Sequence, residues 1–463
     1  MSTVFNINDD RIQKALDQAK NLSDNQVRDI FQKAKELKGL NDNDIATLMM
    51  IENQDLLNEL YHTAFEIKEI IYGKRLVIFA PLYISNYCKN ECLYCAFRAS
   101  NKDLHRKALN QEEISEEVKL LLQQGHKRIL IVAGESYPPH EGLQYILDAI
   151  ATTYATKIPN AEVRRVNVNL APMTVDEFKQ LKNAKIGTFQ LFQETYHIPT
   201  YEKMHVAGKK RDYQWRITAF DRAMEAGIDD VGIGVLFGLA DWKYEILAMM
   251  QQIQHLEQKF GVGPHTISVP RLEPAHGSDI ASNPPYPVSD QDFKKIVAIL
   301  RLAVPYTGMI LSTRENAELR KDILALGISQ ISAGSRTNPG GYKDSEQFDY
   351  AQFQLGDHRG IDEVIQDITK DGYIPSFCTG CYRLGRTGAD FMDLAKPGEI
   401  KKHCQPNAIS TFLEYLIDFA SPKTKEIGMQ LIQDTLKTMD PKIRQTTERM
   451  IEKIQQGKRD VYV

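Results

Sequence analysis

The segment LVIFAPLYISNYCKNECLYC, residues 76–95, joins an apolar run to three closely spaced cysteines. Residues 76–85 are rich in aliphatic and aromatic side chains, which predicts a β-strand. Directly after it, Cys88, Cys92 and Cys95 have the spacing C-x3-C-x2-C. In barrels of parallel strands, the loops that follow the strands form the active-site face. The segment therefore predicts a strand that leads straight into a functional loop.

Seven further stretches of the same kind follow, with amphipathic helical segments between them. The eight predicted strands are residues 76–85, 128–133, 163–170, 187–193, 230–238, 265–272, 308–313 and 329–335. The signals that start and end the helices between them are Asn110 with Glu113, Thr174 with Glu177, Gly125, Gly227 and Gly327. Eight βα repeats over about 290 residues favour an α/β fold of the TIM type, a parallel (β/α)8 barrel. An open doubly wound sheet is the alternative that the same alternation allows.

Two other regions flank the predicted barrel, residues 76–372. Residues 1–75 read as a helical N-terminal extension, in which Ser23 and Gln26 form a capping box. After residue 373 the βα pattern is lost. Residues 373–463 contain a stretch rich in glycine and polar residues and then helices, which predicts a separate C-terminal domain.

The composition excludes several classes of protein. The chain has 463 residues, 42% of them hydrophobic, and a net charge of 57 − 61 = −4. These values are ordinary for a globular protein and give no sign of a nucleic-acid or membrane-surface partner. We find neither a signal peptide nor an apolar run long enough for a membrane helix, so we expect a cytoplasmic protein.

The six cysteines form two triplets with none left over. The second triplet is Cys378, Cys381 and Cys404, with the spacing C-x2-C-x22-C. In a large cytoplasmic chain thiols stay reduced, so metal or cluster ligation is a better interpretation than disulfides. Three thiolates of the first triplet could hold three irons of a cubane cluster and leave the fourth iron open. Zinc is the alternative, although it usually takes a fourth protein ligand.

The first triplet, with Tyr94 directly before its third cysteine, resembles the radical S-adenosylmethionine (SAM) superfamily. The resemblance implies that Cys88, Cys92 and Cys95 hold a 4Fe-4S cluster whose open iron binds SAM. In this superfamily one electron from the cluster cleaves SAM to a 5′-deoxyadenosyl radical. A second feature of the family, two glycines and a glutamate that bind the SAM amino group, matches Gly134 and Glu135, with Ala133 in place of the first glycine.

Residues 193–205, 215–216, 232–239 and 241–242 resemble the tyrosine lyases of this superfamily. That group contains the 2-iminoacetate synthases of thiamine biosynthesis and the HydG-type maturases of iron–iron hydrogenase. The second triplet favours the HydG type, in which this spacing holds an auxiliary iron–sulfur cluster with an additional "dangler" iron. The resemblance implies that Cys378, Cys381 and Cys404 bind the auxiliary cluster and that His265 is a ligand of the dangler iron.

The resemblance also implies a reaction. L-tyrosine would be cleaved to p-cresol and dehydroglycine, and the latter would yield carbon monoxide and cyanide for the hydrogenase active site. Expected partners are a reductant such as ferredoxin or flavodoxin and the other hydrogenase maturases. From the residues alone, Arg314 or Arg336 is our candidate for the tyrosine carboxylate, beside Ser335, while Glu194 and Arg216 are candidates for the SAM aminoacyl group.

His265 begins the sixth predicted strand, whereas the first triplet follows the first strand. The two sites should therefore lie at opposite ends of the barrel, on the order of 20 Å apart. We expect a channel between them, and a fully packed interior would contradict it. Two other functions remain open. A 2-iminoacetate synthase would leave the second triplet unexplained, and a non-catalytic iron–sulfur scaffold or electron carrier would leave Glu135 and Glu194 unexplained.

Overall fold

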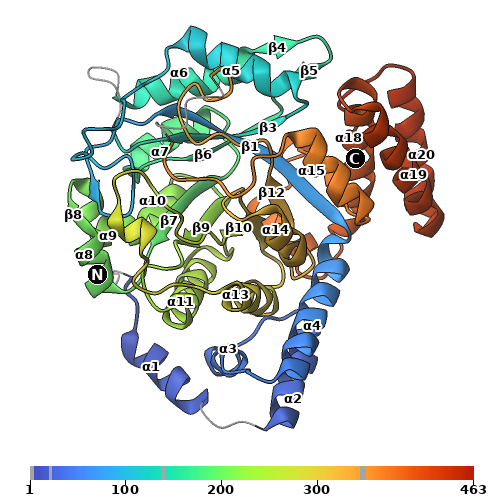
Figure 1. The fold of residues 1–463 in the computed structure, drawn as a ribbon. Helices are drawn as coiled ribbons and strands as arrows, with labels where there is room; N and C mark the ends of the chain where they lie inside the picture. Colours follow the sequence, from blue (N-terminus) through green and yellow to red (C-terminus); the bar gives the residue numbers. More distant parts are fainter. Residues whose placement is uncertain (1–4, 20–22, 137–141, 345–350) are drawn as a thin grey trace.

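The computed structural model describes residues 5–19, 23–136, 142–344 and 351–463, and its centre is a closed barrel of eight parallel strands (Figure 1). The strands are β1 (Arg75–Ser85), β3 (Arg128–Ala133), β6 (Arg165–Asn169), β7 (Phe189–Glu194), β9 (Val231–Val235), β10 (Thr266–Ser268), β11 (Gly308–Leu311) and β12 (Gln330–Ser332). β12 pairs with β1, with Val77 opposite Gln330, and this pairing closes the barrel. The predicted barrel is confirmed, and the open sheet is excluded.

All eight predicted strands exist, but most are shorter than expected. β10 has 3 residues where we expected 265–272. Pro270 has no backbone N–H to donate to a ladder, and beyond Ser268 only single contacts remain, such as Phe237 N–H to Pro270 O at 2.9 Å. The apolar runs thus predicted the strands correctly but extended into the loops that follow them.

Helices cover the outside of the barrel (Figure 1). Those between or after the strands are α5 (Gln111–Gln123), α6 (Gly142–Ala155), α7 (Val175–Asn183), α10 (Ala219–Glu225), α11 (Trp242–Phe260), α13 (Asp290–Ala303), α14 (Ala317–Leu324) and α15 (Ile361–Lys370). The capping boxes at Asn110 and Thr174 are present. Gly125, Gly227 and Gly327 have positive φ angles of 89°, 84° and 138°, as expected of helix-ending glycines.

The N-terminal extension is helical, as predicted, and lies against the barrel helices. It consists of α1 (Asp9–Gln18), α2 (Asp24–Ala34), α3 (Asp42–Met49) and α4 (Gln54–Tyr72), with the Ser23–Gln26 capping box at α2. Lys295 of α13 donates from Nζ to the carbonyls of Met49 and Ile51, both at 2.9 Å, and so holds the end of α3. Among the described residues, no helix combines the length and apolarity needed to cross a bilayer.

The C-terminal region is joined to the barrel sheet, which its glycine-rich sequence did not indicate. β13 (Ile374–Ser376) pairs in parallel with the start of β1. Val77 lies opposite both Gln330 and Ser376, so β12 and β13 flank β1 on opposite edges. β13 is therefore on the β3 side, at the amino-terminal end of the barrel. The segment that carries Cys378 follows it directly.

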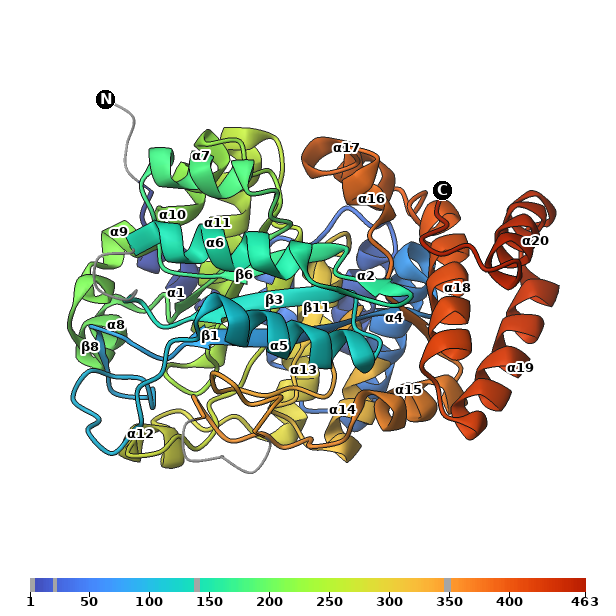
Figure 2. The same ribbon diagram turned by 90° about the horizontal axis from the view of Figure 1, so that it is seen from above.

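Five helices complete the C-terminal region: α16 (Gly380–Arg383), α17 (Gly388–Ala395), α18 (Lys401–Asp418), α19 (Pro422–Thr438) and α20 (Pro441–Gln455). A fully buried ion pair between Lys127 and Glu414 fixes α18 to the barrel, and Arg164 reaches the same carboxylate at 2.9 Å. Figure 2 shows α18, α19 and α20 at one end of the molecule, whereas β8 (His205–Ala207) and α8 (Ile198–Met204) lie at the other end.

Candidate functional site

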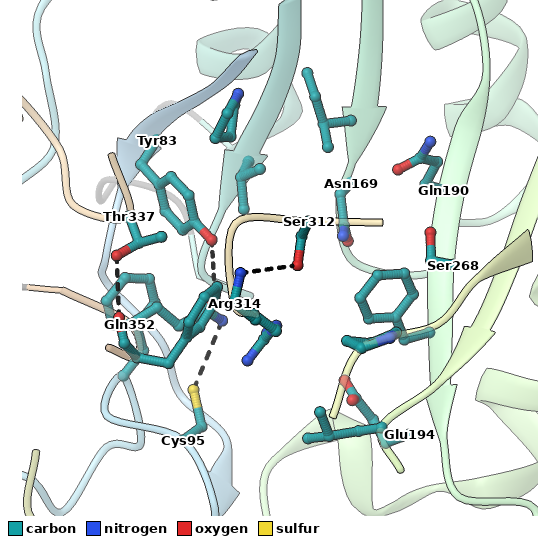
Figure 3. Close-up of a pocket in the computed structure, with 18 of the residues that line it drawn as sticks. Tyr83, Cys95, Asn169, Gln190, Glu194, Ser268, Ser312, Arg314, Thr337 and Gln352 are labelled. Atoms are coloured by element: carbon teal, nitrogen blue, oxygen red, sulfur yellow. Dashed lines mark hydrogen bonds between the residues drawn. The ribbon is translucent and has the colours of Figure 1, made fainter. Parts of the chain in front are cut away.

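A cavity of about 190 Å³ opens at the carboxyl ends of the barrel strands (Figure 3). The three cysteines of the first triplet line it, together with side chains from most of the strands. Figure 3 shows Asn169, Gln190 and Ser268 on one side of it, with Tyr83, Thr337 and Gln352 on the other. Cys88, Cys92 and Cys95 thus lie where the parallel barrel predicts a site.

Hydrogen bonds hold the loop of the first triplet in shape. Arg106 donates to the carbonyls of Asn86 and Phe97 at 2.7 and 2.9 Å, and also to those of Arg98 and Asn101. On the other side, β2 (Glu91–Cys92) pairs with β8, with Cys92 opposite His205. The loop is therefore fixed on both sides, which pre-organises the thiols for a ligand.

Tyr94 is buried beneath this loop. Its hydroxyl lies 2.8 Å from His205 Nε2, and His205 Nδ1 lies 2.8 Å from the carbonyl oxygen of Tyr201. Burial, aided by Lys210, lowers the pKa of His205 to about 2, so its imidazole is neutral. Tyr94 therefore anchors the β8 segment to the first-triplet loop, while its ring lines the cavity.

Gly134 packs against the same loop. A Cβ at this position would lie 2.2 Å from the carbonyl oxygen of Tyr87, so only glycine fits. Its N–H donates to Ser85 O at 2.9 Å, which continues the register of β3 against β1. The preceding Ala133 is paired with Ser85, so the alanine that departs from the family pattern is accommodated within the strand. Glu135 follows and points into the cavity.

Four charged residues form a buried network at the cavity wall. Arg216 lies 2.8 Å from Glu135 and 3.6 Å from Glu194, while Lys210 lies 2.6 Å from Glu194. Asn90 donates to the second oxygen of Glu135 at 2.7 Å. The predicted residues Glu135, Glu194 and Arg216 are thus brought together, and their charges suit a zwitterionic amino-acid group.

The backbone of Glu194 is strained. Its φ is +72°, and the ladder between β7 and β9 shifts register between Phe192 and Glu194. Such a conformation is costly for a residue with a Cβ and is typical of functional sites. The irregularity turns the carboxylate of Glu194 toward Lys210 and Arg216.

Within the network, Glu135 and Lys210 keep their charges at neutral pH. Burial alone would raise the pKa of Glu135, but Arg216 and Lys210 outweigh it, and the pKa lies below its usual value. Burial and Arg216 oppose the charge of Lys210, yet Glu194 and Cys92 raise its pKa. In the metal-free chain, burial and Glu135 raise the pKa of Cys88 to about 11. Metal coordination would deprotonate that thiol.

The candidates for the tyrosine carboxylate are not equivalent in the structure. Arg314 lies in the cavity, stacked over the Phe353 ring at 3.3 Å, and its guanidinium makes no hydrogen bond to any described residue. Ser335 lines the cavity too, and its buried Oγ has no partner within the described residues. Arg336 does not line it, because the chain alternates here and Ser335 and Thr337 face inward. Arg314 is therefore the better placed of the two arginines.

The cavity residues that sequence reasoning missed include Asn90, Lys210, Glu273 and Gln352. Gln352 connects β1 to the first triplet, because it accepts from Tyr83 Oη at 2.7 Å and its amide contacts Cys95 Sγ at 3.8 Å. Burial and Glu315 raise the pKa of Glu273 to about 7. Only Lys210 had a signal, the basic run 209–211, but nothing in that run distinguished it from its neighbours.

A second, smaller cavity lies at the amino-terminal end of the barrel. Cys378, Cys381 and Cys404 line it together with His265, and Arg75, Arg128 and Gln330 come from the starts of strands. Arg128 donates to the carbonyl of Cys378 at 2.9 Å. The two cysteine triplets thus lie at opposite ends of the barrel, as expected. Within the described residues, no three or more Cys, His, Asp or Glu side chains are arranged to hold a single metal ion.

The charges around the second triplet suit an anionic cluster. Arg75 and Arg165 make no hydrogen bond through their side chains to any described residue, and the buried Nε of each is unpartnered. Burial would lower the pKa of Arg75, but Cys404 and Cys378 raise it. Cys381 donates to Cys404, which lowers the Cys404 pKa, and Arg75 adds to that effect. Thiolates bound to iron would supply the negatively charged partner that these arginines lack.

Between the cavities, a row of paired positions crosses the barrel interior and is small or polar after its first member, Val132. The paired positions run Val132, Asn169, Gln190, Gly232, Thr266 and Gly308 across six strands. The first three line the large cavity and Gly308 lines the small one. A Cβ on Gly232 would lie 2.5 Å from Thr266 Oγ1. The last three positions, Gly232, Thr266 and Gly308, carry none of the bulky branched side chains that usually fill such barrels.

Comparison with known proteins agrees with this geometry. The family model Radical SAM superfamily matches residues 82–252, and Biotin and Thiamin Synthesis associated domain matches residues 268–374. The 2-iminoacetate synthase of Escherichia coli (strain K12) is 30% identical over 347 residues, which cover 74% of this chain and 88% of that protein.

Two solved structures match nearly the whole chain. One is HydG, a maturase of the FeFe-hydrogenase, with 52% identity, 99% coverage of both chains and a TM-score of 0.95. The other is the FeFe-hydrogenase maturase HydG from Carboxydothermus hydrogenoformans, with 39% identity, 96% and 98% coverage and a TM-score of 0.83. Both matches extend through the region of the second triplet. The chain therefore belongs to the radical SAM superfamily and, within it, to the HydG type, which is related to the 2-iminoacetate synthases.

Proposed function

We propose that this chain is a tyrosine lyase that takes part in maturation of the iron–iron hydrogenase. It would cleave L-tyrosine to p-cresol and dehydroglycine and convert the latter to carbon monoxide and cyanide for an iron–carbonyl–cyanide unit. The observation that carries the proposal is the presence of two cysteine-lined cavities at opposite ends of one barrel. The match to HydG structures over 99% and 96% of the chain supports it.

In the large cavity, Cys88, Cys92 and Cys95 would hold the 4Fe-4S cluster with SAM on its open iron. When bound, these groups supply the 5′-deoxyadenosyl radical. The chain's own residues would orient SAM and shield the radical from water. Glu135 and Glu194 would receive the SAM amino group, and Arg216 and Lys210 its carboxylate. The apolar walls, such as Phe79 and Leu272, exclude water from the radical.

Arg314 would bind the carboxylate of tyrosine, because it is a half-buried guanidinium in the cavity without a hydrogen-bond partner among the described residues. Ser335, with its unpartnered Oγ, would donate to the same carboxylate. A fixed carboxylate holds the amino group in one place for hydrogen abstraction, which is the main contribution an enzyme makes to such a step.

At the other end, Cys378, Cys381 and Cys404 would hold the auxiliary cluster, and His265 the dangler iron. The row from Asn169 to Gly308 would be the route by which small intermediates travel between the cavities. Its hydroxyl and amide groups can hydrogen-bond a polar imino acid, while the glycines at 232 and 308 leave space.

The test is an anaerobic assay of the reconstituted protein with dithionite, SAM and tyrosine. p-Cresol and carbon monoxide are quantified in the same tube. We expect both products from the intact protein, and we expect that Cys378→Ala with Cys381→Ala abolishes carbon monoxide and spares p-cresol. p-Cresol without carbon monoxide from the intact protein would instead indicate a 2-iminoacetate synthase, which the 30% identity to that enzyme keeps as the second candidate.

A further inference from the structure

Glu273 lines the large cavity five residues beyond the end of β10, and the steps described above give it no role. It is half-buried, and its carboxylate neither accepts a hydrogen bond nor forms an ion pair among the described residues. A carboxylate that is partly withdrawn from water without such a partner is unfavourable. A cationic group of a bound molecule would therefore be stabilised beside Glu273.

The charged residues around Glu273 set its protonation. Burial raises its pKa most, and the carboxylates of Glu315 and Asp290 raise it further. Arg314 and Arg271 lower it, and the resulting pKa is about 7. Arg271 is already engaged as a counterion, because it donates to Glu315 at 3.0 Å and to Asp290 at 2.8 Å. Near neutral pH, Glu273 can therefore take up or release a proton.

Arg314, our candidate for the substrate carboxylate, points into the same cavity (Figure 3). β10 and β11 pair in parallel, so the segments after them, which carry Glu273 and Arg314, leave the barrel side by side. A third segment contacts both. The ring of Phe353 stacks over Arg314 at 3.3 Å, and the N–H of Gln354 donates to Pro274 O at 2.9 Å. The two charges influence each other's pKa without forming an ion pair, so one ligand can contact both.

We propose that Glu273 binds the amino group of the substrate amino acid and accepts a proton from it. The inference rests on the proposed function, in which hydrogen is abstracted from that amino group. An α-amino acid carries its amino group and its carboxylate on one carbon, so a molecule held by Arg314 has its nitrogen nearby, on the side where Glu273 lies. At neutral pH the amino group is an ammonium ion, which has no lone pair to stabilise a nitrogen radical. Proton transfer to Glu273 supplies the neutral amine.

The step moves one proton and changes no oxidation state. An N–H bond of the ammonium breaks and its electron pair stays on nitrogen, while an O–H bond forms on the carboxylate of Glu273. The bound pair is then a neutral amine and a carboxylic acid. The acid returns its proton to water when the products leave, so the step needs no co-reactant.

The first measurement is calorimetric titration of the reconstituted full chain with tyrosine, with SAM present and no reductant, so that no radical forms. Titrations in buffers of different protonation enthalpy give the number of protons released. Glu273→Gln keeps the shape of the side chain, and Glu318→Gln, at an exposed position of α14, is the matched control. Free Glu273 is mostly protonated at pH 6 and must ionise to bind the ammonium. We expect release of about one proton per tyrosine at pH 6 and nearly none at pH 8, in the intact protein and the control, and none from Glu273→Gln.

The second measurement is the pH profile of p-cresol formation with dithionite. In the intact protein and the control, kcat/KM for tyrosine should fall as pH falls through about 7. Glu273→Gln should lose this dependence, and its kcat at pH 7 should be at least about 100-fold lower, the lower end of what a general base contributes. Glu273→Asp keeps an acid at the site and should lose less activity. If Glu273→Gln does not fold, a shifted pH profile in Glu273→Asp supports the proposal and an unchanged one overturns it.

Equal proton release by Glu273→Gln and the intact protein overturns the proposal. A higher KM with an unchanged kcat also overturns it, because the carboxylate would then attract the ammonium without taking its proton. Weaker SAM binding with unchanged tyrosine binding and proton release would assign Glu273 to SAM and overturn it too. Failure of the intact protein to bind tyrosine would contradict the proposed function instead.

Discussion

His265 and Asp230 face each other at the amino-terminal end of the barrel, with Nδ1 and Oδ1 3.4 Å apart. Asp230 is buried, and neither of its carboxylate oxygens has a hydrogen-bond partner among the described residues. The carboxylate therefore favours the tautomer with the proton on Nδ1, which leaves Nε2 free as a metal ligand. Tyr382 Oη is 3.4 Å from Nε2 and would have to yield this position to the metal.

Replacing Asp230 by asparagine should weaken iron binding at His265. The amide keeps the size of the side chain but does not select the tautomer, and loss of such a partner typically costs 10–100-fold, that is roughly 1.4–2.7 kcal/mol, in metal affinity. Competition with a chelator, followed by iron analysis, measures the effect. Asp393→Asn, at an exposed site on α17, is the control. An unchanged affinity in Asp230→Asn would show that Asp230 does not position His265.

Replacing Arg216 by methionine should make SAM binding depend on pH. The pKa of Glu135 is raised by burial and lowered more strongly by Arg216 and Lys210, so the carboxylate is charged throughout the neutral range. Without Arg216 its pKa rises, and SAM affinity should then fall as pH falls through the new value. The intact protein should show a flat profile. Equilibrium dialysis of SAM at a series of pH values measures both, and two parallel profiles would refute the role given to Arg216.

Replacing Gly232 by alanine should lower the yield of carbon monoxide without lowering that of p-cresol. The new Cβ would lie 2.5 Å from Thr266 Oγ1 and 2.9 Å from Gln190 Cγ, which narrows the row between the cavities. Such overpacking costs about 1–3 kcal/mol of stability, which a large domain tolerates. We expect p-cresol to persist and carbon monoxide to fall severalfold. Gly360→Ala, where the nearest atom lies at 3.7 Å, is the control. Equal loss of both products would argue against a route along this row.

Replacing Arg75 by methionine should destabilise the reconstituted protein more than the metal-free protein. In the metal-free chain Arg75 is half-buried and its buried Nε has no hydrogen-bond partner among the described residues, while, against the effect of burial, Cys404 and Cys378 raise its pKa and so stabilise its charge. With a cluster on Cys378, Cys381 and Cys404, the same change removes the cationic partner of a larger negative charge. Thermal unfolding should show a larger fall in the midpoint with iron than without it. Equal falls in both midpoints would mean that Arg75 is structural only.

The sequence predicted the elements of the barrel better than their ends. Apolar runs report burial, and burial continues past the last ladder hydrogen bond, as at residues 269–272 beyond β10. β13 was not predicted, since its 3 residues, with a proline in the middle, lie beside a glycine-rich segment and carry no periodic pattern. Its place is determined by the edge of β1 rather than by its own sequence.

The residues of the candidate site were also predicted only in part. Cysteine spacing is a local signal, and both triplets line cavities as their spacing suggested. Glu135, Glu194 and Arg216 also lie together at one cavity, and their role toward SAM stays a prediction. Lys210 and Gln352 were not predicted, because they approach the cavity from segments outside the barrel strands whose course only the folded chain determines. Arg336 shows the limit of placing residues by position alone, since one step along an extended segment turns a side chain to the other face.

β1 is also a ruler. It has 11 residues, which at ~3.3 Å per residue span roughly 35 Å. This length exceeds the distance of about 20 Å that we expected between the two sites. Arg75 at its beginning belongs to the small cavity, and Ser85 at its end leads into the loop of the first triplet. One continuous strand therefore sets the distance between the two cysteine-lined cavities. Because a paired strand neither shortens nor stretches appreciably, a movement of the outer helices would leave the distance between the two cavities unchanged.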